Sequence, residues 1–119
     1  MSAPNILQVS TIVGKTDVLD VTTVATAIVS NAAASNSVYK INALVIANID
    51  GTNACDVSVE IYRNSTAYRL INTVTVVADS SFIALGRDYP LYLEEGDSLR
   101  VIASANGDLT AVCSYEVIT

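Results

Sequence analysis

The chain has 119 residues, of which 51% are hydrophobic, 15% charged and 6% aromatic, and it contains neither histidine nor tryptophan. Six basic and twelve acidic residues give a formal net charge of −6, and the basic residues are scattered singly, which argues against a nucleic-acid partner. The absence of histidine excludes Ser-His-Asp and Cys-His catalysis and removes the commonest metal ligand, so we expect no enzyme, no catalytic residue, no cofactor and no metal.

Residues 1–14 are expected to form an N-terminal arm, followed by a single domain over residues 15–119. Apolar side chains in the arm are candidates for contact with a partner protein: Ile6, Leu7, Val9 and Ile12. The N-terminus has no basic residue before an apolar run and does not resemble a signal peptide. The longest apolar runs, such as residues 43–47, are far shorter than the ~20 residues of a membrane span. We therefore expect folding in a cytoplasm and no membrane partner.

The first half of the domain alternates strand-like segments with turns. Residues 17–21 and 24–30 are expected strands, and residues 31–37 form a loop of small side chains. The longest apolar segment, residues 38–49, is expected to be a central strand that places one set of side chains on a single face: Tyr39, Ile41, Ala43, Val45, Ala47 and Ile49. The next strand directs Val57, Val59 and Ile61 inward, and a turn at residues 63–66 returns the chain into residues 67–78 as a hairpin.

The second half continues with a short strand at residues 82–85, a loop, and the segment from Leu91 to the end. Residues 98–103 and 109–119 alternate regularly on either side of Asn106-Gly107, which favours a closing hairpin between them. About eight antiparallel strands with regular turns indicate an all-β sandwich. The strand order is left open between a jelly roll and an immunoglobulin-like sandwich.

The two cysteines, Cys55 and Cys113, share the alternation of the expected core positions. A disulfide across the sandwich is one possibility, but cysteines of a chain folded in a reducing compartment are usually buried free thiols, which we expect here.

Two acidic turns and a group of tyrosines are the remaining candidate sites. Glu94, Glu95 and Asp97 are expected to form a solvated turn rather than a catalytic acid pair. Oxygen clusters at residues 50–56 and 94–97 do not match the twelve-residue calcium loop. Tyr62 and Tyr68 flank one turn and are candidates for stacking on a sugar or a partner, the alternative being cross-strand packing.

Several segments together resemble small virion structural proteins of tailed phages, especially those of marine cyanobacteria. The similarity extends over nearly the whole chain and consists of turns and strands: Ile6-Leu7-Gln8-Val9, Gly14-Lys15-Thr16, residues 48–53, Tyr62-Arg63, Ala78-Asp79 and residues 91–100. The resemblance implies a non-enzymatic β-sandwich protein of the virion and brings no catalytic or ligand-binding residue with it.

The leading hypothesis is a capsid decoration or cement protein that binds the major capsid protein or other virion proteins and neighbouring copies, as a homo-oligomer on the particle. Low charge, an apolar arm and an acidity that disfavours contact with the genome agree with this hypothesis. The alternative is a receptor- or glycan-binding module of a phage tail, neck or fibre. An enzyme that cleaves glycans with acidic residues alone is the third and least favoured possibility.

Overall fold

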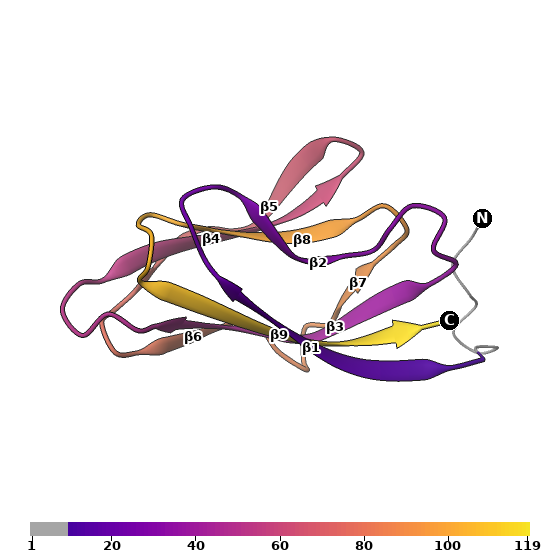
Figure 1. Ribbon diagram of the computed structural model, residues 1–119, viewed down its shortest axis with the longest axis horizontal. Coiled ribbons are helices and arrows are strands. Elements are labelled where there is room, and N and C mark those ends of the chain that lie inside the picture. The colour runs from indigo at the N-terminus through magenta and orange to yellow at the C-terminus, as the bar shows by residue number, and fades with distance from the viewer. Residues whose placement is uncertain (1–9) are drawn as a thin grey trace.

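The computed structural model describes residues 10–119, and within them the chain forms nine β-strands. Their bounds are β1 Ile12–Asp20, β2 Thr26–Ser30, β3 Val38–Asn48, β4 Cys55–Arg63, β5 Thr66–Val76, β6 Ser81–Leu85, β7 Leu91–Leu93, β8 Ser98–Ala103 and β9 Leu109–Ile118. The described part contains no helix long and apolar enough to cross a membrane. The strands lie in two layers (Figure 1), so the expected all-β antiparallel sandwich is confirmed.

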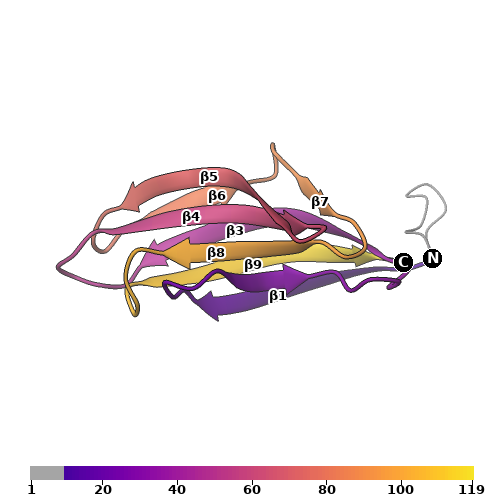
Figure 2. The same ribbon diagram turned by 90° about the horizontal axis from the view of Figure 1, so that it is seen from above.

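The order of the strands is that of a jelly roll. The first sheet has the order β1-β9-β3-β6, with β7 pairing a second stretch of β3, and the second sheet has the order β2-β8-β4-β5. Every pairing is antiparallel. The strands of both sheets run along the long axis of the molecule (Figure 2). The structure thus decides between the two topologies that the sequence left open.

The first strand begins earlier than the sequence analysis expected. Residues 1–14 were assigned to an arm, but β1 starts at Ile12, and Gly14 pairs with Glu116 in the continuous β1–β9 ladder. The amides of Ser10 and Thr11 also donate hydrogen bonds to the carbonyl of Thr119. The boundary at residue 14 is therefore wrong, because the glycine lies within a regular strand. Ile6, Leu7 and Val9 lie outside the described residues.

The core lies between the two sheets and is built mainly from aliphatic side chains, as expected for a chain poor in aromatic residues. Leu44 and Ile46 enter it from the first sheet, and Val59, Leu99 and Val101 enter it from the second. All five side chains are fully buried. Full burial of each such side chain contributes on the order of 1.5–3 kcal/mol, so this layer between the sheets is the main stabilising element of the domain.

A bulge in β3 reverses the predicted alternation of its second half. The register of β3 with β9 shifts between Ile41 and Ala43, which leaves Asn42 as an extra residue. Ile41 points inward as predicted, but beyond the bulge Leu44 and Ile46 are the buried residues, whereas Ala43, Val45 and Ala47 are only partly buried. The single-face prediction for residues 39–49 is therefore correct before Asn42 and wrong after it.

The last two strands do not form a hairpin. β8 belongs to the second sheet, where it pairs with β2 and β4, and β9 belongs to the first, where it pairs with β1 and β3. Residues 104–108 carry the chain from one sheet to the other, so that Leu99 and Leu109 are both buried in the core between the sheets. The two strands were predicted correctly from their alternation, but the prediction that they pair with each other was wrong.

The β4–β5 hairpin, in contrast, is confirmed. Arg63 pairs with Thr66 around a two-residue turn in which Asn64 and Ser65 both have positive φ, at 51° and 61°, the pattern of a type I′ turn. β5 carries two register shifts against β4, one between Val57 and Val59 and one between Val59 and Glu60. These bulges shape the outer face of the second sheet.

Candidate assembly surface

A row of aliphatic side chains crosses the outer face of the first sheet. Val18 of β1 pairs with Val112 of β9, Val112 pairs with Val45 of β3, and Val45 pairs with Ile83 of β6. Paired residues lie on the same face of a sheet, and the β9 neighbours of Val112, which are Ala111 and Cys113, point into the core. Val18 is 75% exposed, Ile83 66% and Val112 40%. We call these four residues the aliphatic row.

Small side chains flank the aliphatic row on both sides. The neighbouring register positions hold Thr16, Ser114 and Ala43 on one side, and Asp20, Thr110, Ala47 and Ser81 on the other. Asp20, at the β1 end, carries the one charge in these three rows. A hollow of about 340 Å³ opens beside Val18 and Val112 and is also lined by Leu19, Asp20 and Thr110. This face therefore offers apolar contact area and a hollow into which a partner side chain can fit.

None of these four residues was predicted from the sequence to contact a partner. Val45, Ile83 and Val112 occupy the outward parity of strands whose inward parity is also apolar, so the alternation alone could not separate a surface residue from a core residue. The available signal was Val112, which lies between two core positions of β9 and therefore had to point outward. Its partners across the sheet could be found only from the register.

The open edges of both sheets carry features that discourage the addition of a further strand. On β1, Lys15 and Asp17 lie on the inward side, opposite Tyr115 and Cys113, and Asp17 accepts a 2.7 Å hydrogen bond from the Tyr115 hydroxyl. β5 carries two bulges, β2 carries one, and β6 has only five residues. Among the described residues, the face of the first sheet is thus a better candidate for contact than any edge.

Of the predicted partner-binding residues in the described part, Ile12 lies at the start of β1 and is 53% exposed. Tyr62 and Tyr68 lie in the β4–β5 hairpin, but Tyr62 pairs with Ala67 and Tyr68 with Ile61, so they point to opposite faces. The ring of Tyr62 lies 4.0 Å beneath the guanidinium of Arg100. The two tyrosines therefore do not form one stacking platform.

The acidic turn between β7 and β8 is only partly solvated. The side chain of Asp97 is 2% exposed, and it accepts hydrogen bonds from Nε and Nη2 of Arg63 and from the amide of Glu94. Burial by itself raises the pKa of Asp97, but the hydrogen bonds from Arg63 and Glu94 and the charge of Arg63 hold that pKa below its usual value. The prediction of a fully solvated turn is therefore wrong for Asp97. Its hydrogen bonds to Arg63 connect the turn to the end of β4.

The acidic side chains in residues 50–56 also accept hydrogen bonds from neighbouring residues. Asp50 accepts hydrogen bonds from the amides of Thr52 and Asn53 and from the Asn53 side chain, and these hydrogen bonds lower its pKa. Asp56 lies on β4 and accepts a 2.7 Å hydrogen bond from the Thr75 hydroxyl. Within residues 10–119 no three acidic or cysteine side chains are grouped so that they could hold a metal ion.

Both cysteines are free thiols and point into the core, as the alternation predicted. Cys55 is 2% exposed and Cys113 is fully buried. Burial and the nearby charge of Asp17 raise the pKa of the Cys113 thiol to about 12. Neither thiol is therefore placed for nucleophilic chemistry or for bonding to another chain.

No protein-family model matches the chain, and no curated protein matches it. Among solved structures, the chain is similar to a protein of Bacillus endospore appendages, which are described as a novel family of disulfide-linked pili. The similarity covers 100% of this chain and 96% of the other, with 19% sequence identity and a TM-score of 0.53. At this identity the likeness shows a common fold.

Proposed function

We propose that this protein is a non-enzymatic structural subunit of a virion, and more specifically a capsid decoration or cement protein that binds the major capsid protein. Neighbouring copies would lie beside it on the particle. The observation that carries the proposal is the aliphatic row on the outer face of the first sheet, with three side chains at least 40% exposed. Apolar side chains in register across four neighbouring strands of a sheet are typical of a surface that another protein covers.

Charge distribution supports contact at this face. The protein has a net charge of −6, so most of its surface repels another acidic surface. The aliphatic row and its flanking residues bear a single acidic side chain, Asp20, so a partner loses little hydration energy there. A partner side chain that fills the hollow beside Val18 and Val112 fixes the position of the subunit. Weak contacts of this kind hold a subunit firmly when many copies bind one lattice.

The fold shared with the Bacillus appendage protein is consistent with a structural subunit that repeats many times. The disulfide linkage named for those pili does not carry over to this chain. Its only two cysteines are Cys55 and Cys113, and both are buried between the sheets. Contacts between copies of this protein are therefore proposed to be noncovalent.

The alternative is a receptor- or glycan-binding module of a tail, neck or fibre. It differs from a decoration protein in its copy number per particle and in what the isolated domain does. A decoration protein is present in many copies per particle and raises the heat stability of the capsid. A receptor-binding module is present in few copies, and the isolated domain blocks adsorption to host cells. Quantifying the protein against the major capsid protein in purified particles separates the two.

The decisive experiment places one negative charge in the aliphatic row. Val18→Asp is expected to lower binding of the purified protein to capsids that lack it by more than tenfold, since a carboxylate would have to be buried at the contact. Val24→Asp is the matched control, because Val24 is 69% exposed and lies outside the sheets, between β1 and β2. Cosedimentation with capsids measures binding, and thermal melting shows that both variants are folded.

Equal binding by wild type, Val18→Asp and Val24→Asp would contradict docking through this face. Ile83→Asp, at the opposite end of the aliphatic row, provides a second test. Loss of binding in Val18→Asp but not in Ile83→Asp would confine the contact to the hollow beside β1 and β9.

A further inference from the structure

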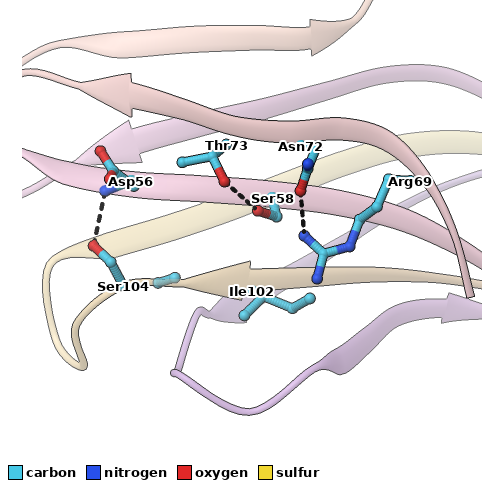
Figure 3. Close-up of a pocket in the computed structure, with 8 residues that line it drawn as sticks. Asp56, Ser58, Arg69, Asn72, Thr73, Ile102 and Ser104 are labelled. Carbon is cyan, nitrogen blue, oxygen red and sulfur yellow. Dashed lines mark hydrogen bonds between the residues drawn. The ribbon is translucent and has the colours of Figure 1, made fainter.

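The outer face of the second sheet contains a polar hollow of about 420 Å³ that the proposed docking surface does not use. It lies on the opposite side of the sandwich, over β4, β5 and β8 (Figure 3). Its lining includes Asp56 and Ser58 from β4, Asn72 and Thr73 from β5, and Ile102 from β8. The volume is within the range of small-molecule sites in proteins.

The hollow results from a bulge in β5. Val57 pairs with Val74 and Val59 with Ile71, so Ser58 alone faces both Asn72 and Thr73. Thr73 has φ of 78°, a conformation that is costly for a β-branched residue. The bulge brings the side chains of Asn72 and Thr73 to the same part of the sheet as Ser58, whose oxygen lies 3.4 Å from that of Thr73.

The polar groups of the hollow keep hydrogen-bonding capacity for a ligand. Asn72 accepts a hydrogen bond from Arg69 through Oδ1, and its Nδ2 has no protein partner among residues 10–119. Asp56 uses Oδ1 to accept the Thr75 hydroxyl, and its Oδ2 has no partner in the same part of the chain. A donor amide and an acceptor carboxylate thus lie at opposite ends of the hollow, with the hydroxyls of Ser58 and Thr73 between them (Figure 3).

Charges around the hollow balance. Arg69 and Arg100 both pair with Glu60, whose side chain is 2% exposed and lies on the same outer face. The charged residues that line the hollow are Asp56 and Arg69, one negative and one positive. A site of this kind does not select a phosphate, a sulfate or a cation by its net charge. It suits a neutral ligand that both donates and accepts hydrogen bonds.

We propose that this hollow binds a neutral saccharide. Sugar hydroxyls both donate and accept hydrogen bonds, so hydroxyls on opposite sides of one ring can donate to Asp56 Oδ2 and accept from Asn72 Nδ2. The Ser58 and Thr73 hydroxyls contact the hydroxyls between them. The half-buried side chain of Ile102, paired with Ser58 across β4 and β8, provides an apolar surface for the C–H groups of the ring. Tyr62 and Tyr68 take no part, since neither lines the hollow.

The test is an NMR titration of the full chain with glucose, galactose, mannose and N-acetylglucosamine, and with glucuronate and glucose 6-sulfate as charged probes. We expect at least one neutral sugar to shift the amide signals of residues 56–58, 69–73 and 102–104 with Kd on the order of 1 mM. Asn72→Ala is expected to weaken that binding about tenfold. Asp56→Asn should weaken it similarly, although the amide oxygen can still accept the Thr75 hydroxyl.

Asn42→Ala is the matched control, because Asn42 is a bulge residue of the first sheet, where it contacts Glu116. It should leave sugar binding unchanged. The proposal is overturned if no sugar shifts these signals, if shifts appear elsewhere, if the charged probes bind more tightly, or if Asn72→Ala and Asp56→Asn bind as wild type does while remaining folded. The Val18→Asp variant should bind the sugar normally, so failure of this site and failure of capsid docking can be distinguished.

Discussion

Asp97 connects two parts of the chain that lie far apart in sequence. Its carboxylate accepts hydrogen bonds from Nε and Nη2 of Arg63, at the end of β4, although the two residues are 34 positions apart. The same guanidinium reaches the exposed Glu94 at 2.8 Å. The hydrogen bond to Asp97 is the chief cause that raises the pKa of Arg63 above its usual value, so the guanidinium stays charged at neutral and acidic pH.

Replacing Asp97 with asparagine should lower the free energy of unfolding by about 2 kcal/mol at neutral pH, since a buried carboxylate loses its charge-assisted hydrogen bonds from the partly exposed Arg63. The folded-state pKa of Asp97 lies below its unfolded value. Its contribution is therefore present above pH about 4 and is lost as the pH falls through the folded pKa. Urea unfolding of both proteins from pH about 7 to about 2.5 should show the difference shrinking in acid.

The control for that prediction is Asp88→Asn, which changes an exposed carboxylate in the loop between β6 and β7. Its unfolding free energy should match wild type across the same pH range. A constant difference between wild type and Asp97→Asn down to the lowest pH would show that the ion pair is not the source of the stability.

The two buried thiols are expected to be unreactive in the folded protein. The pKa of Cys113 is raised to about 12 by burial and by Asp17, and the thiolate is the reactive form. The folded protein should therefore show no rapid reaction with a disulfide reagent at pH about 8, whereas the unfolded protein should expose both thiols. Rapid labelling of the native protein, followed by peptide mapping to Cys55 or Cys113, would contradict this burial.

Among the elements, β5 combines an edge position with two bulges, which suits a strand that must not pair with another chain. Its bulge at Asn72 and Thr73 holds a threonine at positive φ, where only glycine is free of steric cost. The cost of such a position is on the order of 1–3 kcal/mol. The surrounding β4 and β8 pairings are strong enough to maintain it.

Glycine substitutions at two threonines of β5 should therefore have opposite effects. Thr73→Gly is expected to raise the free energy of unfolding by about 1 kcal/mol, because it relieves the positive φ. Thr75→Gly, two residues further along the strand, should lower it by at least about 1 kcal/mol, because glycine loses more conformational entropy in an extended strand and the hydroxyl that donates to Asp56 is removed. Urea denaturation of both variants measures the two signs, and destabilisation of equal size would show that Thr73 is not strained.

The sequence predicted strands better than it predicted their partners. The β4–β5 hairpin was correct because its turn residues Asn64 and Ser65 act locally and adopt the left-handed conformation that the turn needs. The β8–β9 hairpin was wrong, although Asn106-Gly107 looks equally suitable as a turn. Two alternating strands have the same pattern whether they pair side by side or face each other across the core.

Within residues 10–119 the chain forms both sheets of the jelly roll. Because Ile6, Leu7 and Val9 are candidate contacts with a partner protein, deletion of residues 1–9 is expected to abolish particle binding while leaving the melting temperature unchanged. Cosedimentation with capsids and thermal melting test the two parts separately. Normal occupancy by the truncated protein would leave the aliphatic row as the sole proposed contact, and a lower melting temperature would show that the domain needs these residues.

The aliphatic row and the polar hollow also depend on the whole fold, since each is made of residues from three or four strands. Val18, Val112 and Ile83 are far apart in sequence and come together only through the β1-β9-β3-β6 order. Asn72 became part of a candidate site because a bulge places it opposite Ser58. From the sequence, partner contacts were expected at the arm and at Tyr62 and Tyr68, and neither surface could be assembled without the register of the strands.

Composition and alternation by themselves determined that this protein is an all-β sandwich with an aliphatic core, two inward cysteines and no histidine chemistry, because these properties depend on residue type and on the two-residue period of a strand. The tertiary structure alone decided the jelly-roll order, the reversal of β3 at Asn42 and the burial of Asp97. Those features depend on which strands pair and in what register, and pairing energies between distant segments leave no periodic trace in the chain.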